Sequence, residues 1–224
     1  LRRLLAAAVL CNGATLRQNN GVWTVIGDPT EGALLVAAAK VSLTKENVEQ
    51  GSSFQGEIPF DAERKMMTVV RREADGSKAY VKGAPDIVLK RCTHRMTLGG
   101  VIEPLNDQQR QALLDINISL ARETLRVLAV AERALTGAPG ELQSDSIEQD
   151  LVFLGLCAMK DPLRPEAKEA VRLCREAGIR TVMITGDHKD TAVAIARELG
   201  LSDGEGAALS GAEIGKLSDE QLVE

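Results

Sequence analysis

Residues 179–199 read IRTVMITGDHKDTAVAIAREL, and this stretch passes from a β-branched run through Thr185, Gly186 and Asp187 into a helical pattern. The pattern predicts a strand that ends at Thr185 and a helix that begins after Asp187. A hydroxyl, a backbone without a side chain and the N–H groups of a new helix favour a bound phosphate at such a junction. The alternative is a tight turn with Asp187 as the helix cap, and the junction alone does not decide between the two.

Residues 151–224 alternate strands and helices. The sequence predicts a strand at residues 151–159, a helix at residues 166–177 that ends at Gly178, and a second strand and helix in the stretch quoted above. This order indicates a parallel sheet with right-handed crossovers. Two strands do not make a stable domain, so we expect the segment to be an incomplete part of a larger α/β fold.

Residues 1–150 have a different pattern, in which helices flank strands joined by short turns. Helices are predicted at residues 1–11, 28–40 and 84–91 and from Asn106 onward, and strands at residues 57–61, 66–72, 78–82 and 126–135. Residues 74–77 form a hairpin turn, and residues 136–150, rich in Gly, Pro, Ser and acidic residues, are expected to form a surface loop. The sequence therefore predicts an α+β domain with an antiparallel sheet over residues 1–150, followed by a partial α/β segment over residues 151–224.

The composition excludes several classes of protein. A net charge of -5 and an aromatic content of 2% argue against a nucleic-acid binder. The longest apolar runs are shorter than the roughly 18 residues of a membrane span. The cysteines lack C-x-x-C spacing, which indicates reduced thiols in a cytosolic protein and no metal site. The helical pattern begins abruptly at Leu1, and this suggests a piece of a longer chain.

Phe60 stands at the end of a predicted strand, and Lys65 follows in the same motif, IPFDAERK. A flat apolar face beside a cation suits an adenine ring with its phosphates, since aromatic stacking contributes about 0.5 to 1.5 kcal/mol. The alternative is a core Phe and a solvated Lys. The two residues are candidates for a nucleotide site.

Lys82 and Gly83 end another predicted strand. Gly83 lets a ligand approach the bare backbone while the Lys82 ammonium meets a negative group, whereas a plain turn would not require the lysine. Glu31 could accept a hydrogen bond from an exocyclic amine, but it also completes a capping box with Asp28, which is a sufficient structural role.

Two further sets of residues are candidates. Arg126 opens an otherwise apolar strand, where it is either a solvated edge residue or a phosphate clamp. Asp161, Pro162 and Arg164 lie where the two patterns of structure meet, and a stiff, charged linker there could act as a hinge.

Short motifs in a fixed order carry a resemblance to a known family. They are GDPTEG at residues 27–32, PF with RK at residues 59–65, KGAP at residues 82–85, DPLR at residues 161–164 and MITGD at residues 183–187. In this order, and with these elements between them, they resemble the P-type cation-transporting ATPases, and in particular the calcium-pump-like group of bacterial type. The likeness covers nearly the whole chain.

The resemblance implies a nucleotide-binding domain over residues 1–150. Within it, Phe60 would stack on adenine and Glu31 would contact the adenine amine. Lys65 and Lys82 would line the pocket, with Gly83 beside them.

The resemblance also implies that residues 151–224 are part of a phosphorylation domain with a haloacid-dehalogenase-like fold. Thr185, Gly186 and Asp187 would hold the γ-phosphate end of ATP. Arg126 would reach the phosphates beside the hinge residue Asp161.

Departures from the family pattern limit the implied activity. Ala62 stands where animal pumps carry an Arg, and Leu163 replaces a Pro of the hinge. The segment with the phosphorylated Asp and the segment that binds Mg²⁺ are absent from this sequence. The resemblance thus implies a piece that binds ATP without hydrolysing it.

In the intact enzyme, the resemblance implies cation transport, with calcium as the expected ion, at the cytoplasmic face of a bacterial plasma membrane. The partners would be the phosphorylation, actuator and membrane domains of the same polypeptide. Two other functions remain open, a soluble haloacid-dehalogenase-like phosphatase with a large cap and a non-catalytic ATP-binding module.

Overall fold

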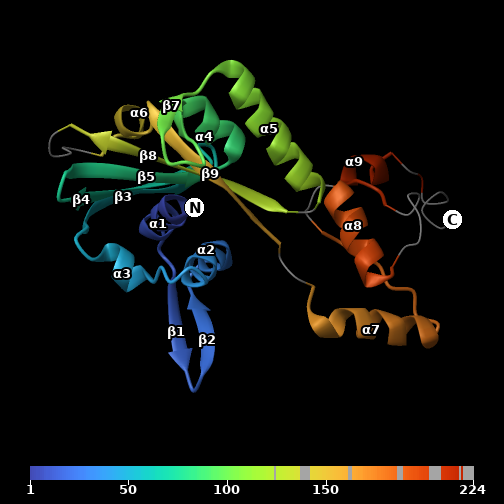
Figure 1. Ribbon diagram of the computed structural model, residues 1–224. Coiled ribbons are helices and arrows are strands. Elements are labelled where there is room, and N and C mark those ends of the chain that lie inside the picture. The colour runs from blue at the N-terminus through green and yellow to red at the C-terminus, as the bar shows by residue number, and fades with distance from the viewer. Residues whose placement is uncertain are drawn as a thin grey trace. The chain divides into compact units, whose positions relative to one another are not determined.

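The structure is a computed structural model that describes residues 1–123, 125–136, 142–160, 163–185, 189–201, 208–216 and 218. Its contacts divide the chain into two compact units. Leu1–Asn117 and Val127–Met159 form the first unit, and Ile118–Arg126 and Lys160–Glu224 form the second. Figure 1 shows the helices and strands, most of them labelled.

A seven-stranded sheet forms the centre of the first unit, in the order β3-β4-β5-β8-β9-β6-β7. Its strands are β3 (Ser53–Asp61), β4 (Met66–Glu73), β5 (Gly76–Gly83), β6 (Cys92–Met96), β7 (Ile102–Pro104), β8 (Arg126–Leu135) and β9 (Leu151–Met159). Successive strands from β3 to β5 and on to β8 pair antiparallel, as do β6 and β7, whereas β6 and β9 pair parallel. The predicted α+β fold is confirmed, but its sheet is mixed.

β9 lies inside this sheet, between β8 and β6, although the sequence pattern places residues 151–159 at the start of the second segment. The physical reason is packing, because Leu151 and Phe153 belong to a buried cluster that also contains Val81 of β5 and Leu89. The first compact unit accordingly continues to Met159. The naming of the two segments as nucleotide-binding and phosphorylation domains stays a prediction.

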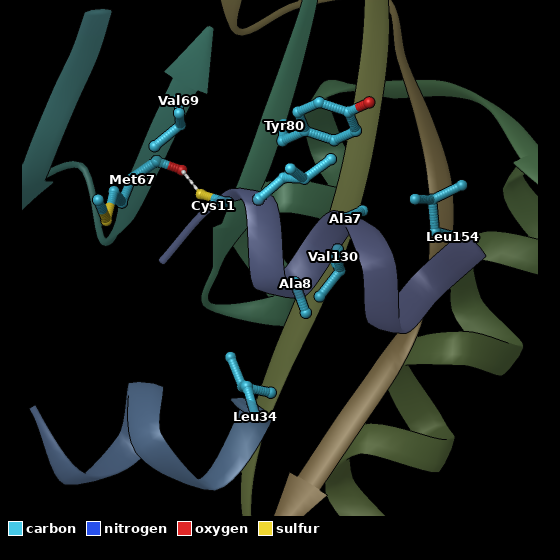
Figure 2. Packing of buried hydrophobic residues seen from close by; sticks show 10 residues of the cluster. Ala7, Ala8, Cys11, Leu34, Met67, Val69, Tyr80, Val130 and Leu154 are labelled. Carbon is cyan, nitrogen blue, oxygen red and sulfur yellow. Dashed lines mark hydrogen bonds between the residues drawn. The ribbon is translucent and has the colours of Figure 1, made fainter. Parts of the chain in front are cut away.

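Helices flank the strands of the first unit. They are α1 (Arg2–Leu10), α2 (Pro29–Ala39), α3 (Lys45–Glu49), α4 (Pro85–Arg91), α5 (Asp107–Arg122), whose last turn belongs to the second unit, and α6 (Ser144–Ile147). α1 packs through short side chains, since Ala7 and Ala8 are buried in one cluster with Tyr80 of β5 (Figure 2). The Cys11 thiol, just after the helix, donates to the Met67 carbonyl at 3.6 Å. Close approach of α1 to the sheet therefore depends on small residues.

A separate two-stranded sheet pairs β1 (Thr15–Asn19) with β2 (Val22–Ile26), and the sequence analysis did not predict it. Asn20 and Gly21 join the strands with φ angles of 50° and 81°. Two positive φ angles in succession are typical of the tight hairpin turn that Asn-Gly favours. The Asn-Gly pair between two strand-like runs was thus the signal that could have revealed this hairpin.

The predicted surface loop over residues 136–150 is wrong for its described part. Residues 137–141 lie outside the described residues, but α6 and the turn after it pack into the first unit. Ile147 is buried against Val70 and Ala79, and Glu148 is fully buried. The polar composition gave no sign of this burial, because Glu148 is held by ionic contacts with distant residues.

The second unit contains α7 (Pro165–Glu176), α8 (Lys189–Leu199) and α9 (Gly211–Ile214). The two longer helices end as predicted, at Gly178 with φ 73° and at Gly200 with φ 75°. Among the described residues of this unit from 163 to 218, none forms a strand.

The predicted strand at residues 179–185 is therefore wrong in this structure. Ile179, Val182 and Ile184 are 59%, 72% and 93% exposed. β-branched residues favour a strand only where a neighbouring strand supplies hydrogen bonds and a packing surface. The haloacid-dehalogenase-like fold consequently stays a prediction.

Candidate functional site

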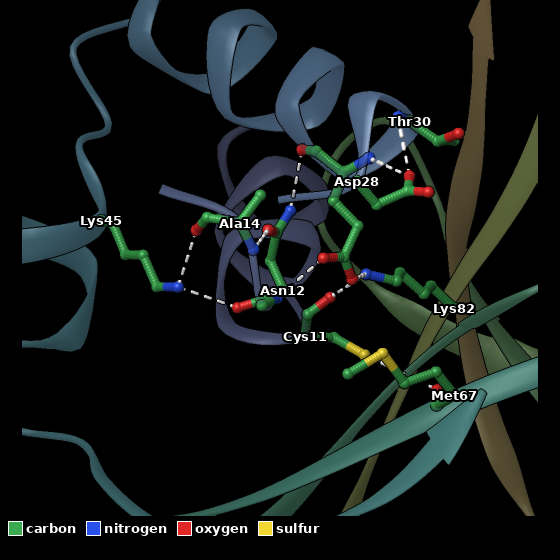
Figure 3. Close-up of polar contacts among 10 residues, drawn as sticks. Cys11, Asn12, Ala14, Asp28, Thr30, Lys45, Met67 and Lys82 are labelled. Carbon is green, nitrogen blue, oxygen red and sulfur yellow. Dashed lines mark hydrogen bonds and ion pairs between the residues drawn. The ribbon is translucent and has the colours of Figure 1, made fainter. Parts of the chain in front are cut away.

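Lys82 and Glu31 form a largely buried ion pair in the first unit. Lys82 lies near the end of β5, and its ammonium donates to the Cys11 carbonyl at 2.6 Å and to a carboxylate oxygen of Glu31 (Figure 3). The Lys82 and Glu31 side chains are only 8% and 16% exposed. The structure thus brings together two residues that the sequence analysis proposed for a nucleotide pocket.

Glu31 lies in the first turn of α2, where Asp28 is the N-cap. The Asp28 carboxylate accepts from the N–H of Thr30 at 2.8 Å and of Glu31 at 3.1 Å. Partial burial acts to raise the pKa of Asp28, but these N–H donors outweigh it and hold the pKa below its ordinary value. The Glu31 carboxylate is bound by Lys82 and, at 3.0 Å, by the Gly13 N–H. Its contacts therefore reach across the fold, in place of the local capping box that the sequence suggested.

The loop after α1 is held by residues that the sequence analysis missed. Asn12 accepts from the Ala14 N–H and donates to the Glu31 carbonyl, each at 2.9 Å. Lys45 donates to the carbonyls of Asn12 and Ala14 at 2.9 and 3.0 Å. This loop presents Gly13 to Glu31, so its conformation fixes one face of the ion pair.

Phe60 is not a core residue, because its side chain is 64% exposed near the end of β3. Lys65 is exposed in the turn between β3 and β4, with a φ of 53°. The Lys65 carbonyl accepts from the Ala84 N–H at 2.9 Å, directly after Gly83. A Cβ added to Gly83 would lie 2.5 Å from the Lys65 carbonyl oxygen, so only glycine permits this approach.

The strand register places these residues at one end of the sheet. Met66 of β4 lies opposite Asp61 of β3 and opposite Gly83 of β5. The end of β3, the β3–β4 turn and the end of β5 thus lie side by side. Gly83 itself is buried against the Lys65 carbonyl and Met66, so its place here is to let the strand ends pack closely. An exposed aromatic ring and an exposed cation are groups that suit a nucleotide site.

The remaining predicted site residues are not tested by the structure. Arg126 opens β8 with an exposed side chain and belongs to the second compact unit. Arg164 is exposed at the start of α7, and Thr185 is exposed beyond that helix. Gly186 and Asp187 of the phosphate junction, and Asp161 and Pro162 of the hinge, lie outside the described residues.

A cleft of about 400 Å³ lies elsewhere in the first unit, at the β1–β2 hairpin. It is lined by Thr15, Leu16, Arg17, Gln18, Asn19, Trp23, Leu35, Ala39, Leu43, Thr44, Lys45 and Glu46, so it includes none of the predicted site residues. Lys45 connects this cleft to the loop after α1. Within the described residues, no group of three or more His, Cys, Asp or Glu side chains could hold a metal ion.

The Cys11 thiol is fully buried beside the ion pair. Burial raises its pKa from 9.0 to about 12, and the charge of Lys82 offsets only part of this rise. A group whose pKa is higher in the folded state stabilises the fold below its unfolded pKa. That stabilisation is lost as the pH rises through the folded value. For Cys11 the loss falls between pH 9.0 and about pH 12.

This shift predicts a difference between wild type and Cys11→Ala. Above about pH 9, the free energy of unfolding should fall more steeply in wild type, by about 1 kcal/mol per pH unit. Urea unfolding followed by circular dichroism at several pH values measures both slopes. Cys174→Ala, which removes a partly exposed thiol of α7, is the control for the loss of a thiol elsewhere in the chain. Equal slopes in wild type and Cys11→Ala would contradict the prediction.

Within the described part of the chain, none of the helices combines the length and the apolar character that a membrane span requires.

Comparison with known proteins identifies the family. The family described as P-type ATPase, cytoplasmic domain N, matches residues 1–166. Calcium-transporting ATPase 1 of Bacillus cereus is 42% identical over 222 residues, and the match covers 99% of this chain and 24% of that protein. The Calcium-transporting ATPase of Bacillus subtilis is 41% identical over 224 residues, which are 99% of this chain and 25% of that protein. Cation-transporting ATPase pma1 of Synechocystis is 35% identical, with coverage of 100% and 24%.

The chain spans about a quarter of the length of the curated relatives that it matches. The family match and the sequence identities show that the chain belongs to the P-type ATPases, with residues 1–166 corresponding to cytoplasmic domain N of that family.

Proposed function

We propose that the first unit binds ATP where β3 and β5 end, with the adenine ring stacked on Phe60. The observation that carries this proposal is the 64% exposure of Phe60 on a strand whose turn presents the exposed Lys65. An aromatic face binds a flat base, and a neighbouring ammonium attracts phosphate. Gly83 packs against the Lys65 carbonyl and so keeps the two strand ends close together.

Glu31 and Lys82 complete the proposed site. Without nucleotide they satisfy each other, since the Lys82 ammonium bonds to both the Glu31 carboxylate and the Cys11 carbonyl. On binding, the adenine amine would donate to Glu31 and a nucleotide acceptor would receive a hydrogen bond from Lys82. Because these contacts replace an existing ion pair, the net gain is small and a modest affinity is expected.

In the whole protein, we propose that the bound nucleotide supplies the γ-phosphoryl group for transfer to an Asp outside this chain. Arg126 and the junction of Thr185, Gly186 and Asp187 would position the phosphates, with Asp161, Pro162 and Arg164 as the hinge. Mg²⁺ would neutralise phosphate charge in this reaction, and its ligands would lie outside the chain. The chain by itself would therefore bind ATP without hydrolysing it.

The proposed transported ion is Ca²⁺, and the support is that relatives at 42% and 41% identity are named calcium-transporting ATPases. The chain would act at the cytoplasmic face of a membrane, joined to the phosphorylation, actuator and membrane domains of the same polypeptide.

Replacement of Phe60 by Ala tests the nucleotide site. Loss of a stacking face costs about 1 to 3 kcal/mol per base, so ATP should bind Phe60→Ala at least about fivefold more weakly in calorimetric titration. The free energy of unfolding should change little, because the ring is largely exposed.

Phe54→Ala is the matched control, since Phe54 lies on the same strand and is 57% exposed. This variant should bind ATP as wild type does. GTP should bind wild type more weakly than ATP, because Glu31 would accept from the adenine amine. Equal affinity of Phe60→Ala and wild type for ATP would contradict the proposed stacking.

A further inference from the structure

Glu148 is a fully buried carboxylate outside the predicted site. One carboxylate oxygen accepts from the Thr68 hydroxyl of β4 at 2.6 Å and pairs with the guanidinium of Arg64. The other carboxylate oxygen is buried without a hydrogen-bond partner. Burial of a charge is costly, and a core built for stability alone would favour apolar side chains at this position.

The backbone around Glu148 is fixed from several sides. Arg91 donates to the Glu148 carbonyl at 3.1 Å, and Arg133 donates to the Ser146 carbonyl at 2.7 Å. The side chain of Ile147 is buried in an apolar cluster. Glu148 is thus a fixed anchor on the sheet, and the groups that it binds are held in place relative to β4.

Arg64 connects the buried Glu148 to the β3–β4 turn. Its guanidinium binds Glu148 through one nitrogen and the Pro59 carbonyl through another. Pro59 directly precedes Phe60, and Arg64 directly precedes Lys65. One buried carboxylate therefore restrains both ends of the segment that carries the exposed ring and the exposed cation.

The turn is also held by hydrogen bonds to its backbone. Asp61 caps it by accepting from the N–H of Glu63 at 3.0 Å and of Arg64 at 2.8 Å. These bonds define the shape of the turn, and the Ala84 N–H, which donates to the Lys65 carbonyl at 2.9 Å, joins its backbone to the end of β5. Exposed turns move unless side chains secure them. The Arg64–Glu148 pair supplies such a contact.

We propose that Glu148, acting through Arg64, is a positioning residue that holds Phe60 and Lys65 in place for the nucleotide. This inference rests on the proposed function for its ligand. The pair itself touches no nucleotide, and its effect is to reduce the motion that binding would otherwise have to arrest. Ligand affinity rises when the binding groups are ordered in advance.

Variants of the full chain separate positioning from stability. Arg64→Met removes the ion pair between Arg64 and Glu148. Glu148→Gln keeps the shape of the buried side chain but removes its charge. Thr68→Val is the matched control, because it removes the other hydrogen bond to the same carboxylate oxygen and leaves Arg64 in place. If Arg64→Met leaves a buried charge that prevents folding, the double variant with Glu148→Gln removes that charge. Arg64→Lys should restore part of the wild-type behaviour.

Two measurements apply to each variant, namely hydrogen exchange of the amides in residues 60–65 without nucleotide and calorimetric titration with ATP. Arg64→Met and Glu148→Gln should speed exchange of the turn and weaken ATP binding about tenfold, whereas Thr68→Val should lower stability and leave both unchanged. The proposal would be overturned if Arg64→Met kept the wild-type exchange rate and ATP affinity. It would also be overturned if Thr68→Val changed both quantities as much as Arg64→Met does. Failure of the wild-type chain to bind ATP would instead overturn the proposed function, and with it the role of the Arg64–Glu148 pair in nucleotide binding.

Discussion

A chain that ends at Asp150 is expected to lose cooperative folding of the first unit, whereas a chain that ends at Lys160 is expected to keep it. β9 lies between β8 and β6, so its removal would divide the sheet into two parts. Leu151, Phe153 and Leu154 are 0%, 4% and 5% exposed. Burial of three such side chains contributes about 6 kcal/mol, which is comparable with the whole stability of a typical domain, about 5 to 15 kcal/mol.

Urea unfolding followed by circular dichroism would compare the two truncated chains with the full chain. The chain that ends at Lys160 is the control, since it lacks the second unit's C-terminal segment but retains β9. It should unfold in one cooperative transition with a midpoint close to that of the first unit in the full chain. A cooperative transition of similar midpoint in the chain that ends at Asp150 would show that β9 is dispensable.

Replacement of Lys82 by Met should destabilise the first unit by about 3 kcal/mol. The substitution leaves the Glu31 carboxylate and the Cys11 carbonyl without the ammonium that both accept from. Removal of one partner of a buried ion pair costs about 3 to 5 kcal/mol, and the lower end applies here because Glu31 retains the Gly13 N–H. The free energy of unfolding from urea titration measures the loss.

Lys78→Met provides a matched control on the same strand. Lys78 pairs with Glu73 at 2.8 Å, and the two side chains are 18% and 20% exposed. The Lys78 side chain is more exposed than that of Lys82, and Glu73 keeps a hydrogen bond from the Tyr80 hydroxyl, so loss of this pair should cost about 1 kcal/mol. The double variant Lys82→Met with Glu31→Gln should recover much of the stability, since it no longer holds an unpaired charge. Equal losses in Lys82→Met and Lys78→Met would contradict the assignment of Lys82 as a buried ionic anchor.

Features that depend on neighbouring residues were predictable from the sequence. The start of α2 follows from Asp28 and Pro29. The start of α5 follows from Asn106 and Gln109, since the side chain of each accepts from the backbone N–H of the other. The hairpin at Asn20 and Gly21 belongs to the same class, because its signal is local. The Asn-Gly pair alone is therefore enough to predict this hairpin from the sequence.

Features that depend on distant partners were not predictable in this way. Residues 151–159 and residues 179–185 are both β-branched or apolar, yet only the first segment finds a neighbouring strand and becomes β9. Glu148 lies in a polar, loop-like stretch, and its burial depends on Arg64, which is 84 residues away in sequence. Periodicity describes which face a segment can bury, but it does not identify the partner.

The candidate site shows the same division. The sequence singled out Phe60, Lys65 and Gly83 by residue type and position, and the register of β3, β4 and β5 places them together. No pattern in the sequence pairs Glu31 with Lys82 in the absence of a ligand. Their contact arises because the start of α2 and the loop after α1 place the Glu31 carboxylate and the Cys11 carbonyl within reach of the Lys82 ammonium.

The contacts of Lys82 also bear on the order in which the chain folds. Its ammonium reaches a carbonyl 71 residues and a carboxylate 51 residues earlier in the sequence. Loops of this length close slowly, and contacts across them form late. During synthesis, α1 and α2 therefore leave the ribosome before Lys82 of β5 has been added to the chain. They reach their final packing only after β5 has joined the sheet, so this unit should fold more slowly than a domain of equal size built from local contacts.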